Sequence, residues 1–177
     1  CGLLYSGLNA DLTGCEWALH EWVSPELPCL FSDRTQPNST VTLFNDGVFG
    51  DSAHIRIPLI WTVRNSGCSD MDTMWVTFYQ KPDANAGING SVCGFEYELE
   101  AYFDLTETIN YTPSGIWSVC SGPTGETAVF YSATDTDPEV HVWETGLWQF
   151  MWRENNSLLT SCYDTDTVLV EFVETPI

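Results

Sequence analysis

Alternation of apolar and polar residues with a period of two is the feature that most restricts what this chain can fold into. The stretch GFEYELEAYFDL, which begins at Gly94, places carboxylates between most of its apolar residues, and HIRIPLIWTV, which begins at His54, alternates in the same way. Successive side chains of a β-strand point to opposite faces, so both stretches predict strands with one face on a core. The predicted inward residues are Phe95, Tyr97, Leu99, Ala101 and Phe103 in the first stretch, and Ile55, Ile57, Leu59, Trp61 and Val63 in the second.

Turn residues separate seven further segments that are typical of strands. Pro58 has no amide hydrogen and therefore predicts a sheet edge or a bulge. Gly14–Val23 has helix signals, because Thr13 and Glu16 have the spacing of a capping box, although the same residues also alternate. The seven predicted strands are Thr40–Phe44, Thr73–Tyr79, Ile116–Cys120, Thr127–Ser132, Glu139–Trp143, Leu147–Trp152 and Thr167–Val173.

The sequence also contains an internal repeat. CSDMDTMWV from Cys68 and CYDTDTVLV from Cys162 share the pattern C-x-D-x-D-T-x-x-V, 94 residues apart. Upstream, His54–Trp61 and His141–Trp148 share H-x6-W, 87 residues apart, and TVTLF and TAVFY precede them in the same order. The seven-residue difference in spacing predicts an insertion around Glu154–Thr160.

Two halves of about 85 residues have the size of small Ig-like sandwiches. We therefore predict two Ig-like β-sandwich repeats, with one larger β-sandwich or jelly roll built from the duplicated halves as the alternative. Repeat 1 is expected at 13–82, a linker at 83–90 and repeat 2 at 91–177. Residues 1–12 are expected to be an N-terminal extension and a candidate donor strand.

Seven cysteines without any C-x-x-C spacing favour disulfides in an oxidising compartment over a metal site. Repeat symmetry leaves Cys1 unassigned, and we expect it to form a disulfide with a neighbouring subunit or to be lipidated. One symmetric pairing of the other six is Cys29–Cys68, Cys120–Cys162 and Cys15–Cys93. The rival scheme is Cys15–Cys29, Cys93–Cys120 and Cys68–Cys162.

Charge restricts the partners of the chain. It carries 25 acidic residues against five Lys and Arg, a formal net charge of -20. Such a chain repels nucleic-acid backbones and anionic lipid surfaces. No apolar run is long enough to span a bilayer, and a secreted or cell-surface location is expected. Sequons predict a glycoprotein modified at Asn38, Asn89, Asn110 and Asn155.

One stretch resembles a known family. In IWTVRNSGCSDMDTMWVTFYQKPD, from Ile60 to Asp83, a V-x-N-x-G turn formed by Val63, Asn65 and Gly67 leads to the pair Phe78-Tyr79. This is similar to the middle of the Ig-like, cell-adhesion-related repeats of bacterial surface proteins. The resemblance implies an extracellular Ig-like module and supplies no functional residues.

Few residues suggest chemistry. Asp135, Asp137 and Glu139 are the best candidates for a Ca²⁺ ligand set, and solvated loop ends are the alternative. The alternating acids Glu96 to Glu100 fit a solvated strand face better than a catalytic pair, and no nucleophile motif is present. Trp148, Phe150 and Trp152 alternate with Leu147, Gln149 and Met151, so one of these faces is expected in a core.

The leading prediction is a non-enzymatic, secreted structural subunit of an extracellular filament or surface assembly, whose partner is a second copy of itself. Its N-terminal segment is expected to insert into the neighbouring subunit through Leu3, Leu4, Tyr5 and Leu8. The first alternative is a secreted carbohydrate-binding module that binds glycans with exposed aromatics and a structural Ca²⁺. The second alternative is a glycoside hydrolase.

Overall fold

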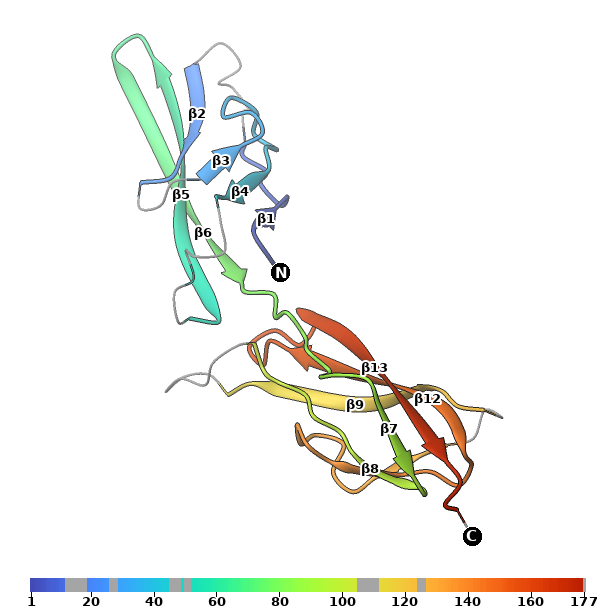
Figure 1. Cartoon of the computed structure of the whole chain (residues 1–177). Helices are drawn as coiled ribbons and strands as arrows, with labels where there is room; N and C mark the ends of the chain where they lie inside the picture. Colours follow the sequence, from blue (N-terminus) through green and yellow to red (C-terminus); the bar gives the residue numbers. More distant parts are fainter. Residues whose placement is uncertain are drawn as a thin grey trace. The chain divides into compact units, whose positions relative to one another are not determined.

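The computed structural model describes residues 1–11, 19–25, 29–44, 49, 52–104, 112–123 and 127–176. These residues form strands joined by turns and contain no helix (Figure 1). In particular, the described ranges hold no helix long and apolar enough to cross a membrane. The chain divides into two compact units, unit 1 from Cys1 to Gln80 and unit 2 from Lys81 to Ile177.

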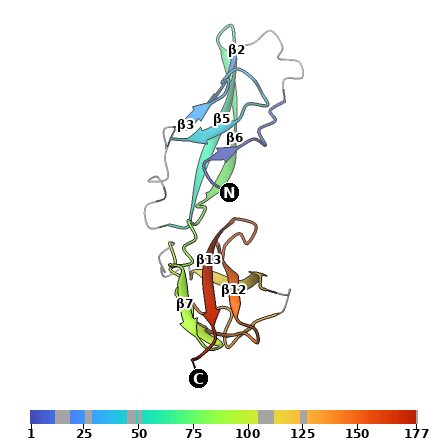
Figure 2. The same ribbon diagram turned by 45° about the vertical axis from the view of Figure 1, so that its right-hand side comes forward.

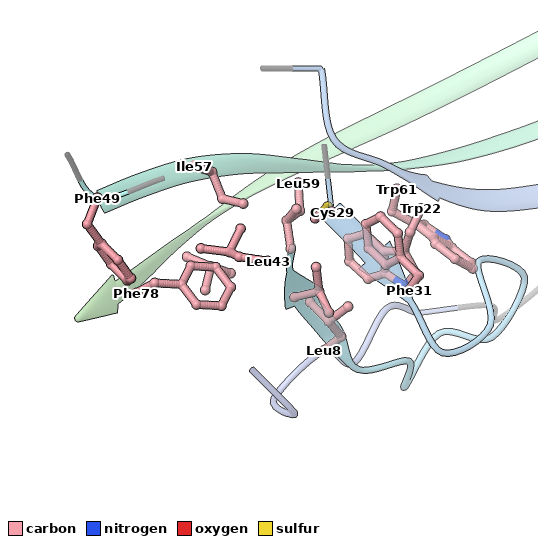
Figure 3. Close-up of a cluster of buried hydrophobic side chains, with 12 residues drawn as sticks. Leu8, Trp22, Cys29, Phe31, Leu43, Phe49, Ile57, Leu59, Trp61 and Phe78 are labelled. Carbon is pink, nitrogen blue, oxygen red and sulfur yellow. The ribbon is translucent and has the colours of Figure 1, made fainter. Parts of the chain in front are cut away.

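Unit 1 is a β-sandwich of two three-stranded antiparallel sheets, ordered β1-β4-β3 and β2-β5-β6. Its longest strands, β5 and β6, form one hairpin (Figure 2). Both sheets contribute to a single buried cluster, in which Trp22 and Trp61 lie side by side and Phe49 and Phe78 lie at the other end (Figure 3). The strands are β1 (Leu4–Tyr5), β2 (Leu19–Val23), β3 (Cys29–Phe31), β4 (Val41–Leu43), β5 (His54–Asn65) and β6 (Cys68–Tyr79).

Unit 2 is a second β-sandwich, with a three-stranded sheet β10-β11-β8 and a four-stranded sheet β7-β13-β12-β9. All its strand pairs are antiparallel except β7 with β13, which is parallel. The strands are β7 (Gly90–Cys93), β8 (Glu96–Glu98), β9 (Ser114–Ser121), β10 (Val129–Phe130), β11 (Glu139–His141), β12 (Gly146–Asn155) and β13 (Tyr163–Val173).

The alternating pattern correctly predicted the buried faces of the long strands. Trp148, Phe150 and Trp152 on β12 are fully buried, whereas Leu147 is 57% exposed. On β5, Ile57, Leu59 and Trp61 are buried in the same way. In GFEYELEAYFDL the regular strand is shorter than predicted, because only Glu96–Glu98 pair, with β11, and Phe95 is 44% exposed.

Pro58 lies on a stretch of β5 that has a single neighbour. β2 pairs with β5 only from Ile60 to Arg64, while Pro58 is opposite Trp75 on β6. On the β2 side, no strand is paired with β5 at Pro58, so the missing amide hydrogen costs no hydrogen bond there. This agrees with the predicted edge position. The helix prediction for Gly14–Val23 is wrong over Leu19–Val23, which is a strand paired with β5, and residues 14–18 lie outside the described part.

Two predicted connecting segments belong to the sandwiches themselves. Ala86, in the predicted linker 83–90, is 1% exposed and packs in the core of unit 2. In the predicted extension 1–12, β1 pairs with β4 and Leu8 is 3% exposed in the core of unit 1. Because these apolar side chains are buried within their own unit, residues 1–11 do not form a free donor strand in this structure.

Candidate functional site

The two units have matching strand orders. The sheets β1-β4-β3 and β2-β5-β6 of unit 1 correspond to β8-β11-β10 and β9-β12-β13 of unit 2. Removing β7 from unit 2 leaves the strand order of unit 1. The predicted repeat is thus visible in the fold, and unit 1 lacks a counterpart of β7 among its described residues.

Pairs of tryptophans fix the register between the units. Trp22 is opposite Trp61 with ring centroids 5.1 Å apart and an interplanar angle of 52°, and Trp117 is opposite Trp152 at 5.3 Å and 50°. Trp61 and Trp152 are also opposite Asp72 and Asp166, the second aspartates of the two D-x-D-T motifs.

This register corrects one of the sequence matches. The counterpart of Trp61 is Trp152, not Trp148, so the shared H-x6-W spacing does not mark equivalent positions. The Asn156 amide donates to Cys162 O at 2.8 Å. The equivalent pair in unit 1 is Asn65 and Cys68, which are opposite each other at the end of the β5–β6 hairpin. The connection in unit 2 is therefore three residues longer than that in unit 1, instead of the seven predicted.

The first residues of unit 1 match those that follow β7 in unit 2. The Gly2 amide donates to Tyr79 O at 2.8 Å, and the Gly94 amide donates to Val173 O at 2.9 Å. Both glycines have positive φ, 84° and 107°, a region that favours glycine. Cys1 therefore corresponds to Cys93, the last residue of β7. The shared pattern C-G-x-x-Y at both places was the sequence signal for this match, and the repeat search missed it.

In unit 2 the outer edge of β13 is covered by residues 81–93. Lys81 Nζ lies 2.6 Å from Asp164 Oδ1, and the Ala84 amide donates to Asp164 Oδ2 at 3.4 Å. The Ala86 amide donates to Asp166 Oδ2 at 2.9 Å. The hydrogen bond from Lys81 is the main cause that lowers the pKa of Asp164. The D-x-D motif of unit 2 therefore binds a segment of the same chain.

Next to this segment, β7 forms the parallel ladder with Val170–Val173 of β13. The Asn89 side chain accepts a hydrogen bond from the Leu169 amide at 2.8 Å. Side-chain acceptors at Asp164 and Asp166 and pairing from Leu169 to Val173 thus hold residues 81–93 along β13.

In unit 1 the described residues place no strand at the corresponding edge. Within the described ranges, β6 pairs with β5 alone. Asp70 and Asp72, the counterparts of Asp164 and Asp166, are exposed, and in this structure each accepts a hydrogen bond only from the amide of the next residue, at 2.9 and 2.8 Å. Sheet edges with unpaired backbone groups are templates for another strand.

A hollow of about 620 Å³ lies beside these carboxylates. Trp22, Trp61 and Met74 supply apolar lining, and Asp70 and Asp72 supply charge. We call the outer edge of β6 together with this hollow the β6 edge, and it is the candidate functional site of the chain.

The cysteines do not follow either predicted pairing. Cys1 and Cys162 are disulfide-bonded in the structure, whereas Cys29, Cys68, Cys93 and Cys120 are free thiols. Cys15 lies outside the described residues. The predicted intermolecular disulfide or lipidation of Cys1 stays a prediction.

Sheet geometry explains why two of the predicted pairs are absent. Cys93 on β7 and Cys120 on β9 lie on opposite edges of a four-stranded sheet, about 14 Å apart at the usual strand spacing. Cys162 directly precedes Tyr163, which pairs with Asn155 of β12, and Asn155 in turn pairs with Ser114 of β9. Cys162 therefore lies near the Ser114 end of β9, whereas Cys120 is about 20 Å further along that strand. Both separations exceed the roughly 7 Å limit between the Cα atoms of a disulfide.

The candidate metal ligands are not assembled into a site among the described residues. Among the described residues no three His, Cys, Asp or Glu side chains are placed to hold a metal ion, so Asp135, Asp137 and Glu139 form no such set. All three are exposed, and Glu139 is held in β11 opposite Glu98. The acids Glu96 and Glu100 are tied to neighbours instead: Glu96 lies 3.4 Å from His141, and Glu100 accepts a hydrogen bond from Tyr102 at 2.6 Å.

The predicted glycosylation positions differ in their surroundings. Asn38 is exposed, and Asn89 is exposed although its side-chain oxygen is bound to β13. Asn155 is half-buried and accepts a hydrogen bond from Arg153 Nε at 2.9 Å. Asn110 lies outside the described part. Asn38 is consequently the most accessible of the three described sites, and glycosylation remains a prediction.

Two of the exposed aromatics, on which the carbohydrate-binding alternative depended, lie against neighbouring side chains. Trp75 is 51% exposed and Arg56 lies over its ring at 4.9 Å, while Trp143 is 54% exposed and packs on His141 at 5.0 Å. Leu3 and Tyr5, predicted to contact a neighbouring subunit, pack against the core of unit 1, and Leu4 is 60% exposed.

No family model matches this chain, and no curated protein matches it. Among solved structures, it is similar to the PKD domain (329–428) from human KIAA0319, with 18% identity, a TM-score of 0.43 and coverage of 52% of this chain and 81% of that one. It is also similar to chicken VE-cadherin EC1-2, with 13% identity, a TM-score of 0.37 and coverage of 98% and 93%.

A third similar structure, mouse clustered PcdhgC3 EC1-3, has 14% identity and a TM-score of 0.38; the match covers 88% of this chain and 56% of that one. These neighbours are PKD and cadherin domains, and bacterial adhesion repeats are not among them. No residue's role is taken from them.

Proposed function

We propose that the chain is a non-enzymatic structural subunit of an extracellular filament or surface assembly, and that the β6 edge pairs with a further extended segment. The observation that supports this most directly is the difference between the units. β13 is completed by residues 81–93, whereas the matching edge of β6 exposes backbone groups, two carboxylates and an apolar hollow. Edges of this kind gain a partner strand in many assemblies.

Two further observations support the proposal. The disulfide-bonded state of Cys1 and Cys162 suits an oxidising, extracellular compartment. Asp164 and Asp166, the D-x-D motif of unit 2, accept hydrogen bonds from backbone amides of the same chain, which is a structural role. Contact through the β6 edge replaces the predicted insertion of Leu3, Leu4, Tyr5 and Leu8, because β1 and Leu8 are part of unit 1.

Electron microscopy of the native material, with this chain labelled by an antibody, tests the proposal. We expect the label on regular filaments or surface layers, at repeating intervals. A glycan array and a panel of glycoside substrates, each with and without a calcium chelator, serve as the matched comparison, and neither binding nor turnover is expected. Label on dispersed single particles, or turnover of a glycoside, would contradict the proposed function.

A further inference from the structure

We infer that the chain binds a second copy of itself through two unlike faces. One is the outer face of the sheet β2-β5-β6 in unit 1, around Arg56, which we call the cationic face. The other is the outer face of the sheet β10-β11-β8 in unit 2, around Glu98 and Glu139, which we call the acidic face. This inference rests on the proposed structural role and names the faces that would join subunits.

The cationic face presents an arginine that is held over an aromatic ring. Ile57 and Val76, the strand neighbours of Arg56 and Trp75, are 1% and 2% exposed. Because side chains alternate between the two faces of a strand, Arg56 and Trp75 point away from the core. The Arg56 guanidinium lies 4.9 Å from the centroid of the Trp75 ring, and Trp75 is still 51% exposed. A cation over an indole ring keeps its N–H donors available to a carboxylate.

This arginine has no acidic partner in the described part of the chain. Arg64 lies on the same face of β5 and has none there either. Of the described Lys and Arg residues, Lys81 alone is in an ion pair with a carboxylate. The chain carries 25 acidic residues, so a cation without an acid beside it is unexpected for a surface that faces only water. Arginine and tryptophan are enriched in protein interfaces, and the cationic face combines both.

The acidic face contains a pair of like charges. Glu98 on β8 is directly opposite Glu139 on β11, and both side chains are exposed. Their strand neighbours Tyr97 and Val140 pack in the core of unit 2, so both carboxylates point outward. Like charges directly opposite each other destabilise a sheet, and no Lys or Arg of the described residues is paired with either one. A guanidinium placed between them would replace this repulsion with charged hydrogen bonds.

Each face also has an exposed aromatic ring next to its charge. Trp75 lies beside Arg56 on the cationic face. On the acidic face, the Tyr131 amide donates to Glu139 O at 3.0 Å and Tyr131 is 69% exposed. Burial of the two rings in a contact would exclude water from the charges between them.

The distribution of charge favours unlike faces. Nine acidic and three cationic residues give unit 1 a formal charge of -6, whereas sixteen acidic and two cationic residues give unit 2 a formal charge of -14. Contact between unit 1 of one copy and unit 2 of another is therefore less repulsive than contact between two copies of unit 2. Because the two faces differ, the contact is heterologous, and such contacts build filaments unless they close into a ring.

Sedimentation velocity of the full chain over a range of concentrations tests the inference. A salt concentration of about 150 mM shortens the Debye length to about 8 Å and so weakens the long-range repulsion between acidic chains. We expect the sedimentation coefficient of the wild type to rise with concentration. R56Q and E98Q/E139Q should each weaken association at least about ten-fold, because one side of the charge pair is lost. A mixture of the two variants should form dimers and nothing larger, since each pair of copies keeps one intact contact.

The matched control is R34Q. Arg34 is also exposed, carries the same charge and lies over an aromatic ring, with 5.9 Å to the centroid of Phe31. Its replacement should leave association unchanged. Hydrogen exchange of each variant alone checks that it remains folded.

Carbodiimide cross-linking of R56K identifies the contact and its source. The substitution keeps the charge and places an amine at position 56. In an equal mixture of unlabelled and 15N-labelled chains, we expect that amine to be linked to Glu98 or Glu139 in peptide pairs of mixed isotope. Lys81 lies 2.6 Å from Asp164 and should link to it within one copy, which provides an internal control.

Three results would overturn the inference. These are a wild type that stays monomeric up to about millimolar concentration, equal association by R56Q and the wild type, and cross-links from position 56 to Glu98 or Glu139 only within single copies.

Failure of this inference can be told apart from failure of the proposed function. Filaments that carry the antibody label, together with association that does not depend on Arg56, would leave the structural role standing and remove this contact. Association that depends on Arg56, together with dispersed native particles, would do the reverse.

Discussion

Replacing Asp166 by alanine, and in parallel Asp72 by alanine, measures how much the D-x-D motif contributes once a chain segment is bound to it. Both side chains accept the amide of the following threonine at 2.8 Å, so both variants lose that local bond. Asp166 additionally accepts the Ala86 amide at 2.9 Å. The difference between the two variants therefore reports the bond to the segment that unit 1 lacks.

The magnitude follows from burial. Ala86 is 1% exposed, so its amide would lose a charged partner without gaining water in exchange. A hydrogen bond to a charged group contributes about 1.5–3 kcal/mol, and we expect D166A to lower the free energy of unfolding of unit 2 by about 2 kcal/mol. Asp72 is exposed and accepts a hydrogen bond only from the adjacent Thr73 amide among the described residues. D72A should therefore change the free energy of unfolding of unit 1 by less than about 0.5 kcal/mol.

Urea denaturation followed by amide hydrogen exchange separates the units, because β5–β6 and β12–β13 give different peptides. Exchange of β7 and of residues 84–87 should accelerate most in D166A, since that segment loses its anchor. Equal destabilisation by the two substitutions, or accelerated exchange confined to the loop 156–162, would refute the correspondence drawn between the units.

Three other outcomes are expected. Trp152→Ala should lower the stability of unit 2 by about 3–5 kcal/mol in urea unfolding, whereas Trp143→Ala, at a 54% exposed position, should change it by less than about 0.5 kcal/mol. Maleimide should label Cys68 in the folded chain and Cys29 only after unfolding, because Cys29 is 6% exposed and burial raises the pKa of its thiol; rapid labelling of both would contradict this. The pKa of Asp164 is lowered in the folded state, so its ion pair with Lys81 stabilises unit 2 above about pH 4 by at most about 1 kcal/mol. That stabilisation should be lost as pH falls through the folded pKa, and D164N should reduce the difference in urea midpoints of unit 2 between pH 6 and pH 3; an unchanged difference would contradict this.

Sequence matches located the repeat but aligned it only in part. The D-x-D-T motif marks equivalent residues, because its second aspartate is opposite an equivalent tryptophan in both hairpins. H-x6-W does not, since His54 lies on β5 and His141 on β11. A two-residue identity over eight positions is too short to exclude coincidence, whereas matched hydrogen bonds at Gly2 and Gly94 are specific.

Cysteine pairing could not be predicted from the sequence. Repeat symmetry constrains which cysteines are equivalent, but not how far apart they lie. Cys93 and Cys120 belong to the same unit and are still separated by the width of a four-stranded sheet. Such distances depend on strand order, which the spacing of cysteines along the chain does not encode.

The sequence by itself determined which faces of the long strands are buried, since the period of two is local and each of Trp148, Phe150 and Trp152 follows it. Only the tertiary structure decided which strands are neighbours: β7 lies beside β13, and within the described residues no strand lies beside the outer edge of β6. The physical reason is that an edge is made of backbone amides and carbonyls, which all residues except proline carry in full and which therefore leave little sequence pattern. The open β6 edge became visible only when the two units could be compared strand by strand.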